Sequence, residues 1–171
     1  QRCGADGGAS AESRALALQS LRTLRSLLSA SNDENDLDAV VASGVVPFLA
    51  ALVQHPTAAL RVEACWCLAN VAAGEAQHAQ AVLPTAALMI RIASGGAGGA
   101  NASLVDAAVW CIGNLAAEED ATRGGLVRLG ALAPIVRIAR DPTVSLTTAR
   151  MAAWSLSNLA RTHPAAGTRA P

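Results

Sequence analysis

The sequence contains no Lys and no Tyr, and its aromatic side chains are one Phe and three Trp among 171 residues. Strands usually draw on aromatic and β-branched residues, whereas the Ala and Leu that are abundant here favour packed helices. Hydrophobic residues make up 52% of the chain, which is enough for a core, so we predict a folded all-α protein. The formal net charge is zero, so we expect neither nucleic acid nor membrane as a partner.

Signatures of catalysis, metal binding and membrane insertion are also missing. No apolar run reaches the roughly 18 residues of a membrane span, and no signal peptide opens the chain. The histidines are scattered, and no Ser or Cys nucleophile motif is present. The cysteines lack the paired spacing of metal sites: Cys3, Cys65, Cys67 and Cys111. We therefore predict that the protein is not an enzyme and that it uses neither a metal nor a cofactor.

One segment occurs three times, each time around a Trp. Trp66, Trp110 and Trp154 are separated by two spacings of 44 residues, inside the period of roughly 40–47 residues that is typical of armadillo and HEAT repeats. WD40 repeats have a similar period, but Gly and Pro at 41–49 and 129–136 mark the ends and starts of short helices. The sequence therefore predicts an armadillo-type, right-handed superhelical solenoid.

The predicted solenoid has about three full repeats and a partial first repeat. The Leu spacing of residues 11–28 predicts a helix, with a polar turn at 31–36, and the Gly-rich segment 94–100 predicts a surface loop in the middle repeat. The composition of both ends is that of linkers, so we expect a piece of a longer protein. The expected boundaries are a linker at 1–10, a partial repeat at 11–36, full repeats at 37–79, 80–123 and 124–165, and a linker at 166–171.

Each Trp is followed four residues later by an Asn, and on a helical wheel this pair lies opposite the apolar side of its segment. The three Asn are Asn70, Asn114 and Asn158. Asn is a poor helix former, and burying its amide without partners costs about 1–3 kcal/mol. We therefore interpret the Trp–Asn pairs as a groove in which Asn bonds the backbone of an extended peptide and Trp packs against its long side chains. Alternatively, each Trp packs against a neighbouring repeat.

The charges near the Trp residues favour basic peptide side chains. Indole binds cations, and Glu118 begins an acidic run after the middle Trp, while Glu63 and Asp106 precede the first and middle Trp by a few residues. Arg150 and Arg161 flank the third Trp, so we expect the negative charge over the first two repeats. A solvated turn is the alternative for the acidic run.

These motifs resemble importin-α over about residues 11–165. The resemblance rests on the Trp-x-x-x-Asn segments, the helix starts Ser43-Gly-Val-Val-Pro47 and Leu129-Gly-Ala-Leu-Ala-Pro134, and the ending Trp154-Ser-Leu-Ser-Asn-Leu-Ala-Arg161. It implies a nuclear import adaptor of the cytoplasm and nucleus. Such an adaptor holds basic nuclear-localisation-signal peptides on the three Trp–Asn pairs and joins an importin-β-like carrier through segments outside this sequence. Glu118 stands where the family has Asp in its deepest lysine pocket.

The same comparison brings out two departures, because Ala79 and Ala107 stand where the family's lysine pocket has Thr and Gln. Two other functions are open. An armadillo scaffold like β-catenin has a basic groove for acidic partners, and a solenoid block can simply stack on other repeats without binding a ligand. The regular Trp–Asn period favours the import adaptor over the basic scaffold.

Overall fold

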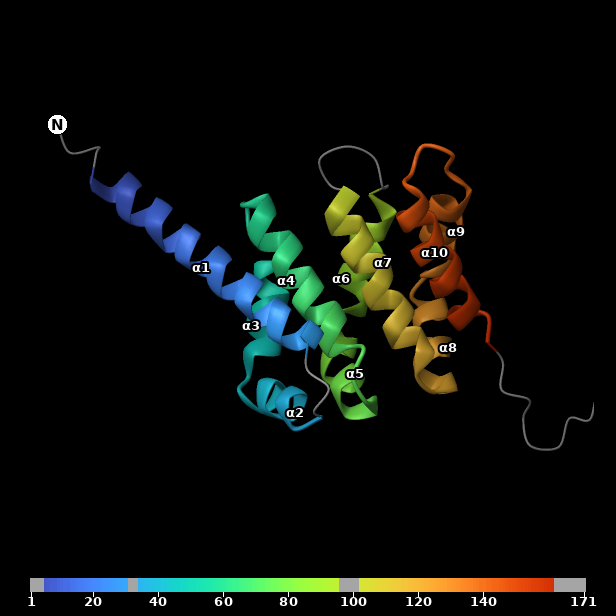
Figure 1. The fold of residues 1–171 in the computed structure, drawn as a ribbon. Helices are drawn as coiled ribbons and strands as arrows, with labels where there is room; N and C mark the ends of the chain where they lie inside the picture. The colour runs from blue at the N-terminus through green and yellow to red at the C-terminus, as the bar shows by residue number, and fades with distance from the viewer. Residues whose placement is uncertain (1–4, 31–33, 96–101, 162–171) are drawn as a thin grey trace, which may run out of the picture. The chain divides into compact units, whose positions relative to one another are not determined.

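The computed structural model describes residues 5–30, 34–95 and 102–161 (Figure 1). All secondary structure in these ranges is helical, which confirms the predicted all-α class. The chain divides into two compact units, residues 1–82 and residues 83–171. Within the described ranges, no helix is both long and apolar enough to cross a membrane.

The first unit contains five helices among its described residues. They are α1 (Ala5–Ala30), α2 (Glu34–Ala42), α3 (Val45–Leu52), α4 (Ala58–Val71) and α5 (Ala76–Val82). Both α1 and α3 pack against α4 (Figure 1). Gly44 separates α2 from α3 with a φ of 75°, a left-handed conformation that Gly adopts without steric cost. The Gly before Pro47 therefore makes the corner between two short helices.

The second unit begins with the 3-10 turn η1 (Leu83–Thr85). It continues with α6 (Ala86–Ser94), α7 (Ala102–Ala117), α8 (Asp120–Arg128), α9 (Leu132–Arg140) and α10 (Leu146–Leu159). The long helices α7 and α10 pack along each other, α6 packs on α7, and α9 packs on α10. Gly130, with a φ of 89°, makes the corner between α8 and α9, as Gly44 does in the first unit.

The core lies on the predicted side of the Trp-bearing helices. Leu68 and Val71 of α4, and Ile112 and Leu115 of α7, have no exposed surface. Ala152 of α10 is likewise fully buried. The side opposite Trp66 and Trp110 is therefore buried as the helical wheel predicted, whereas in the third segment Leu156 is only half-buried.

Some boundaries differ from the sequence prediction. Because α1 begins at Ala5, residues 5–10 are helical although their glycines predicted a linker. Similarly, α2 begins at Glu34, inside the segment 31–36 that was predicted to be a turn. Most of the expected Gly-rich loop, and the expected C-terminal linker, lie outside the described residues.

Candidate functional site

Trp110 and Trp154, on the neighbouring helices α7 and α10, stack on each other. Their ring centroids are 4.6 Å apart and the ring planes are inclined by 27°. Both side chains are half-buried. A side chain inserted between two rings needs about 3.5–4.0 Å to each of them. The space between these two rings, where a long peptide side chain was predicted to pack against Trp, is therefore a closed slot in this structure.

Gly113 makes the stacked arrangement possible. A Cβ atom at this position would lie 2.4 Å from Cζ3 of Trp154 and 2.5 Å from Oγ of Ser155. Real Cβ atoms do not come so close to other heavy atoms, so only Gly lets the Trp154 ring lie against α7. The corresponding positions of the other two repeated segments carry Ala69 and Ser157.

Asn158 is used inside the second unit. It is 1% exposed, its Nδ2 donates to the carbonyl of Gly113 at 3.0 Å, and its Oδ1 accepts from Nη2 of Arg161 at 2.8 Å. One residue after Trp154, Ser155 donates to the carbonyl of Val109 at 3.0 Å. Asn114 is also buried, at 6% exposure. The side-chain amide of Asn158 therefore ties α10 to α7, which differs from the predicted display of Trp–Asn pairs away from the core.

The first unit repeats this bonding pattern between α4 and α1. Asn70 donates to the carbonyl of Arg25 at 3.4 Å and to Oγ of Ser29 at 2.8 Å. Cys67 donates through its thiol to the carbonyl of Leu21 at 3.6 Å. In both units the Asn side chain donates a hydrogen bond to the backbone carbonyl 45 residues earlier. The side chain of the residue after Trp donates one to the backbone carbonyl 46 residues earlier. Helix α1 is thus placed beside α4 as α7 is beside α10.

This equivalence identifies α1 as the last helix of a partial repeat, and it reveals residues that the sequence analysis missed. One period of 44 residues before Trp66 and Asn70 lie Arg22 and Ser26. The signal was therefore present in the sequence, since continuing the Trp period backwards by one step reaches Arg22. The partial repeat carries Arg and Ser at the positions where the later repeats carry Trp and Asn.

Glu63, predicted to supply negative charge near Trp66, forms ion pairs with two arginines of α1. Nε of Arg22 lies 3.4 Å from its Oε1, and Nε of Arg25 lies 3.2 Å from its Oε2. Glu63 is buried, with 8% exposure. Two guanidinium groups and one carboxylate leave a net positive charge beside Trp66, so the expected excess of negative charge is not found there.

A pocket of about 440 Å³ opens at this place. It is lined by Arg22, Arg25, Ser26, Ser29, Trp66 and Asn70. All six residues belong to α1 or α4, so the first unit contains the whole pocket.

Asp106 and Glu118, the other predicted acids, both lie in the second unit. Oδ1 of Asp106 accepts a hydrogen bond from Oγ1 of Thr148 at 2.8 Å, and the backbone N–H of Thr148 donates to Oγ of Ser145 at 3.0 Å. Asp106 thereby holds the N-terminal turn of α10 against α7. Glu118 follows α7 and is half-buried.

Arg123 partly neutralises the acidic run that begins at Glu118. This side chain is 3% exposed, pairs with Asp120, and donates to the carbonyls of Glu118 and Ala116. A cation at the C-terminal end of a helix also interacts favourably with the helix dipole. Arg123 therefore closes the end of α7, and the run is not a purely negative surface.

Ala79 and Ala107, the two departures that the sequence analysis noted, are both buried. Ala79 is 1% exposed in α5, and Ala107 is fully buried in α7.

Burial raises the pKa of the Cys67 and Cys111 thiols to about 12, which favours their neutral form. Across the described residues there is no group of three or more side chains that could hold a metal.

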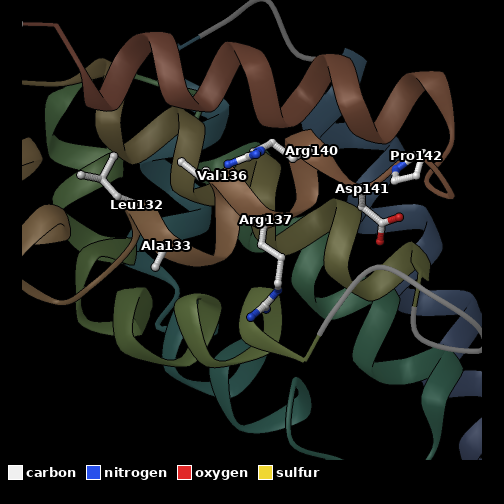
Figure 2. A pocket seen from close by; sticks show the side chains of 7 residues that line it. All are labelled: Leu132, Ala133, Val136, Arg137, Arg140, Asp141 and Pro142. Carbon is white, nitrogen blue, oxygen red and sulfur yellow. The ribbon is translucent and has the colours of Figure 1, made fainter.

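A second pocket, of about 800 Å³, lies along α9 and the start of the following turn (Figure 2). Figure 2 shows its lining residues Leu132, Ala133, Val136, Arg137, Arg140, Asp141 and Pro142. Arg137 donates to the carbonyl of Ser94 at 2.6 Å and so closes the C-terminal end of α6. None of the Trp–Asn residues lines this pocket.

Residues 36–73 match the Armadillo/beta-catenin-like repeat family, and this segment covers nearly all of α2 together with α3 and α4. The chain is 38% identical to importin subunit alpha-9 of Arabidopsis thaliana over 141 residues, which are 81% of this chain and 26% of that protein. It is 33% identical to importin subunit alpha-1a of Oryza sativa subsp. japonica over 159 residues, which are 92% of this chain and 30% of that protein. The chain thus spans less than a third of either relative.

Designed armadillo repeat proteins have a similar structure. One matches with a TM-score of 0.73 and 22% identity over 82% of this chain and 57% of its own. Another, in complex with peptide (KR)4, matches with a TM-score of 0.67 and 22% identity over 82% of this chain and 67% of its own. The likeness shows the armadillo-repeat solenoid fold that the 44-residue period predicted.

Proposed function

Because the chain is an armadillo-repeat protein related to importin subunit alpha over most of its length, we propose that it recognises cargo peptides for nuclear import. The ligand is a basic peptide of the nuclear-localisation-signal type, bound in an extended conformation along Trp66, Trp110 and Trp154. In this proposal the protein acts in the cytoplasm and nucleus together with an importin-β-like carrier.

The regular period of the three Trp residues is the observation that carries the proposal. All three Trp side chains are half-buried, so part of each indole is accessible. Indole attracts Lys and Arg by about 0.5–1 kcal/mol when exposed and by about 2 kcal/mol when desolvated. Asp106 and Glu118 add carboxylates on α7 and directly after it. A designed armadillo repeat protein of similar fold was solved in complex with peptide (KR)4, so this fold can hold a basic peptide.

The stack of Trp110 on Trp154 adds one step to peptide binding. A basic side chain can enter between these rings only after they separate. Separating them loses the stabilisation of roughly 0.5–1.5 kcal/mol that an aromatic pair gives. Asn158 likewise exchanges the Gly113 carbonyl for a peptide carbonyl, and an exchange of one hydrogen bond for another changes the free energy little. The groove in this proposal therefore opens when the peptide binds.

Fluorescence anisotropy with a labelled Lys/Arg-rich peptide tests the proposal, with an acidic peptide of equal length as control. We expect a Kd near 1 μM, equivalent to about −8 kcal/mol, that weakens as salt is added. Glu118→Gln should weaken binding, whereas Glu119→Gln, which removes the same charge from the next residue, should change it less. The import proposal fails if the basic peptide does not bind, or if both peptides bind equally.

The pair of arginines beside Trp66 favours a second candidate, an interaction scaffold that takes acidic partners. Arg22 and Arg25 outnumber the single carboxylate of Glu63 in this part of the first unit. Binding of the acidic peptide alone would support the scaffold and would contradict the import proposal.

A further inference from the structure

The pocket between α1 and α4 combines several donors of hydrogen bonds around the Trp66 indole. Guanidinium groups of Arg22 and Arg25, hydroxyls of Ser26 and Ser29, and the Asn70 amide line it. The Asn70 amide donates to Ser29, and the Ser29 hydroxyl donates to the Arg25 carbonyl at 2.8 Å, so these polar groups are held in place by one another. None of the six lining residues is acidic.

Glu63 positions the two arginines without neutralising them both. Its two carboxylate oxygens contact one Nε each, and a guanidinium carries most of its N–H donors on the Nη atoms. The Arg22 side chain is 61% exposed and that of Arg25 is 40% exposed. A solvent-accessible pair of guanidinium groups with a net positive charge is the arrangement that binds carboxylate and phosphate oxygens through paired hydrogen bonds.

We propose that this pocket binds an anionic side chain of the peptide, either the phosphate of a phosphoserine or the carboxylate of Asp or Glu. The inference rests on the proposed function, because Trp66 and Asn70 belong both to the peptide groove and to the pocket. The preferred ligand then has two parts: a basic cluster for the Trp faces and an anionic residue beside it for Arg22 and Arg25.

The position of Arg22 in the repeat supports this assignment. It occupies on α1 the place that Trp occupies on α4, α7 and α10, so the position changes from a residue that attracts cations to one that attracts anions. A pocket of about 440 Å³ with two arginines has room for an anionic side chain. The formal net charge of the chain is zero, so the rest of the protein does not add the broad positive surface of a nucleic-acid or membrane site.

Peptides that share one basic core and differ at one flanking residue test the inference. The flanking residue is Ser, Glu or phosphoserine, placed on either side of the core in turn, and affinities are measured by fluorescence anisotropy. We expect phosphoserine on one side to bind about fivefold more tightly than Ser, as for an exposed pair of charges, with Glu between them. Added salt should reduce the difference.

Arg22→Gln should abolish the preference for the anionic flank. Arg14→Gln is the matched control, because it removes the same charge from the same helix two turns or more away from the pocket, and it should retain the preference. Ser26→Ala is a second variant at an exposed position, and it should reduce the preference without affecting the fold. Circular dichroism checks that each variant keeps its helices.

The outcomes separate this inference from the proposed function. The anion pocket is overturned, and the import proposal left intact, if the peptides with all three flanking residues bind equally. The same holds if Arg14→Gln and Arg22→Gln lose the preference for the anionic flank to the same extent. A phosphorylated peptide without Lys or Arg provides the opposite test. Its binding is detected through the NMR signal of the Trp66 indole N–H. A shift of that signal that depends on Arg22, without binding of any basic core, supports the pocket and overturns the import proposal.

Discussion

Replacing Gly113 by Ala should separate the Trp110–Trp154 stack. The new Cβ would lie 2.4 Å from Cζ3 and 2.8 Å from Cε3 of Trp154, so the indole has to move. Ala gains about 0.8–1 kcal/mol over Gly in a helix interior. Against this gain, overpacking costs about 1–3 kcal/mol, and loss of the aromatic pair costs about 0.5–1.5 kcal/mol. We expect Gly113→Ala to lower the free energy of unfolding by about 1–2 kcal/mol.

Urea unfolding gives the free energy, and near-ultraviolet circular dichroism follows the coupled Trp rings. Gly125→Ala in α8 is the matched control, because its new Cβ would meet only Nη2 of Arg128, at an ordinary 3.9 Å. That variant should keep the Trp signal and gain up to about 1 kcal/mol. If Gly113→Ala behaves like Gly125→Ala, with greater stability and an unchanged Trp signal, the explanation of the closed slot is wrong.

Three further predictions concern stability and reactivity. Asn158→Ala should lower the free energy of unfolding by about 1–2 kcal/mol, because it removes buried hydrogen bonds. Urea unfolding measures this change, and an unchanged stability would mean that the amide does not hold α10 to α7. Hydrogen bonding by His78 lowers the pKa of Asp38. The ionised Asp38 therefore stabilises the fold above the ordinary pKa of 3.8, and this contribution should be lost as the pH falls below that value. Asp38→Asn should flatten this acid dependence of the unfolding midpoint. Burial raises the pKa of Cys111 to about 12, so a thiol reagent at neutral pH should modify it only after unfolding, as mass spectrometry of the labelled peptide can show.

The fold could be predicted because its signals are local and repeated. The Trp spacing fixed the length of a repeat, the Gly–Pro segments marked helix corners, and the wheel positions of residues such as Leu68 and Ile112 identified the buried face. The helical start of α1 at Ala5 was not predicted, because Gly is unfavourable in helices. Helix propensity is a weak prior, and the ends of a helix are its least predictable part.

The candidate site was less predictable, because its side chains meet across helices that are distant in sequence. The sequence identified Glu63 as an acid near Trp66, but two arginines about 40 residues earlier outweigh its charge, and no local pattern shows that pairing. Stacking of Trp110 on Trp154 depends equally on how α7 and α10 approach each other. The predicted peptide-binding roles of the Trp, Asn and acidic residues stay predictions until a peptide is tested.

The repeated Asn now has an explanation that needs no ligand. Asn70 and Asn158 each bond a carbonyl 45 residues earlier, so an armadillo chain that bound nothing would still gain by keeping Asn at this position. The same argument does not extend to Trp, since an indole that is half-buried leaves apolar surface in water without satisfying any backbone group. The accessible parts of the Trp side chains, together with the charges of Arg22 beside Trp66 and of Glu118 after α7, are therefore the features to test for a peptide receptor, and binding assays on those residues are more informative than substitutions of Asn.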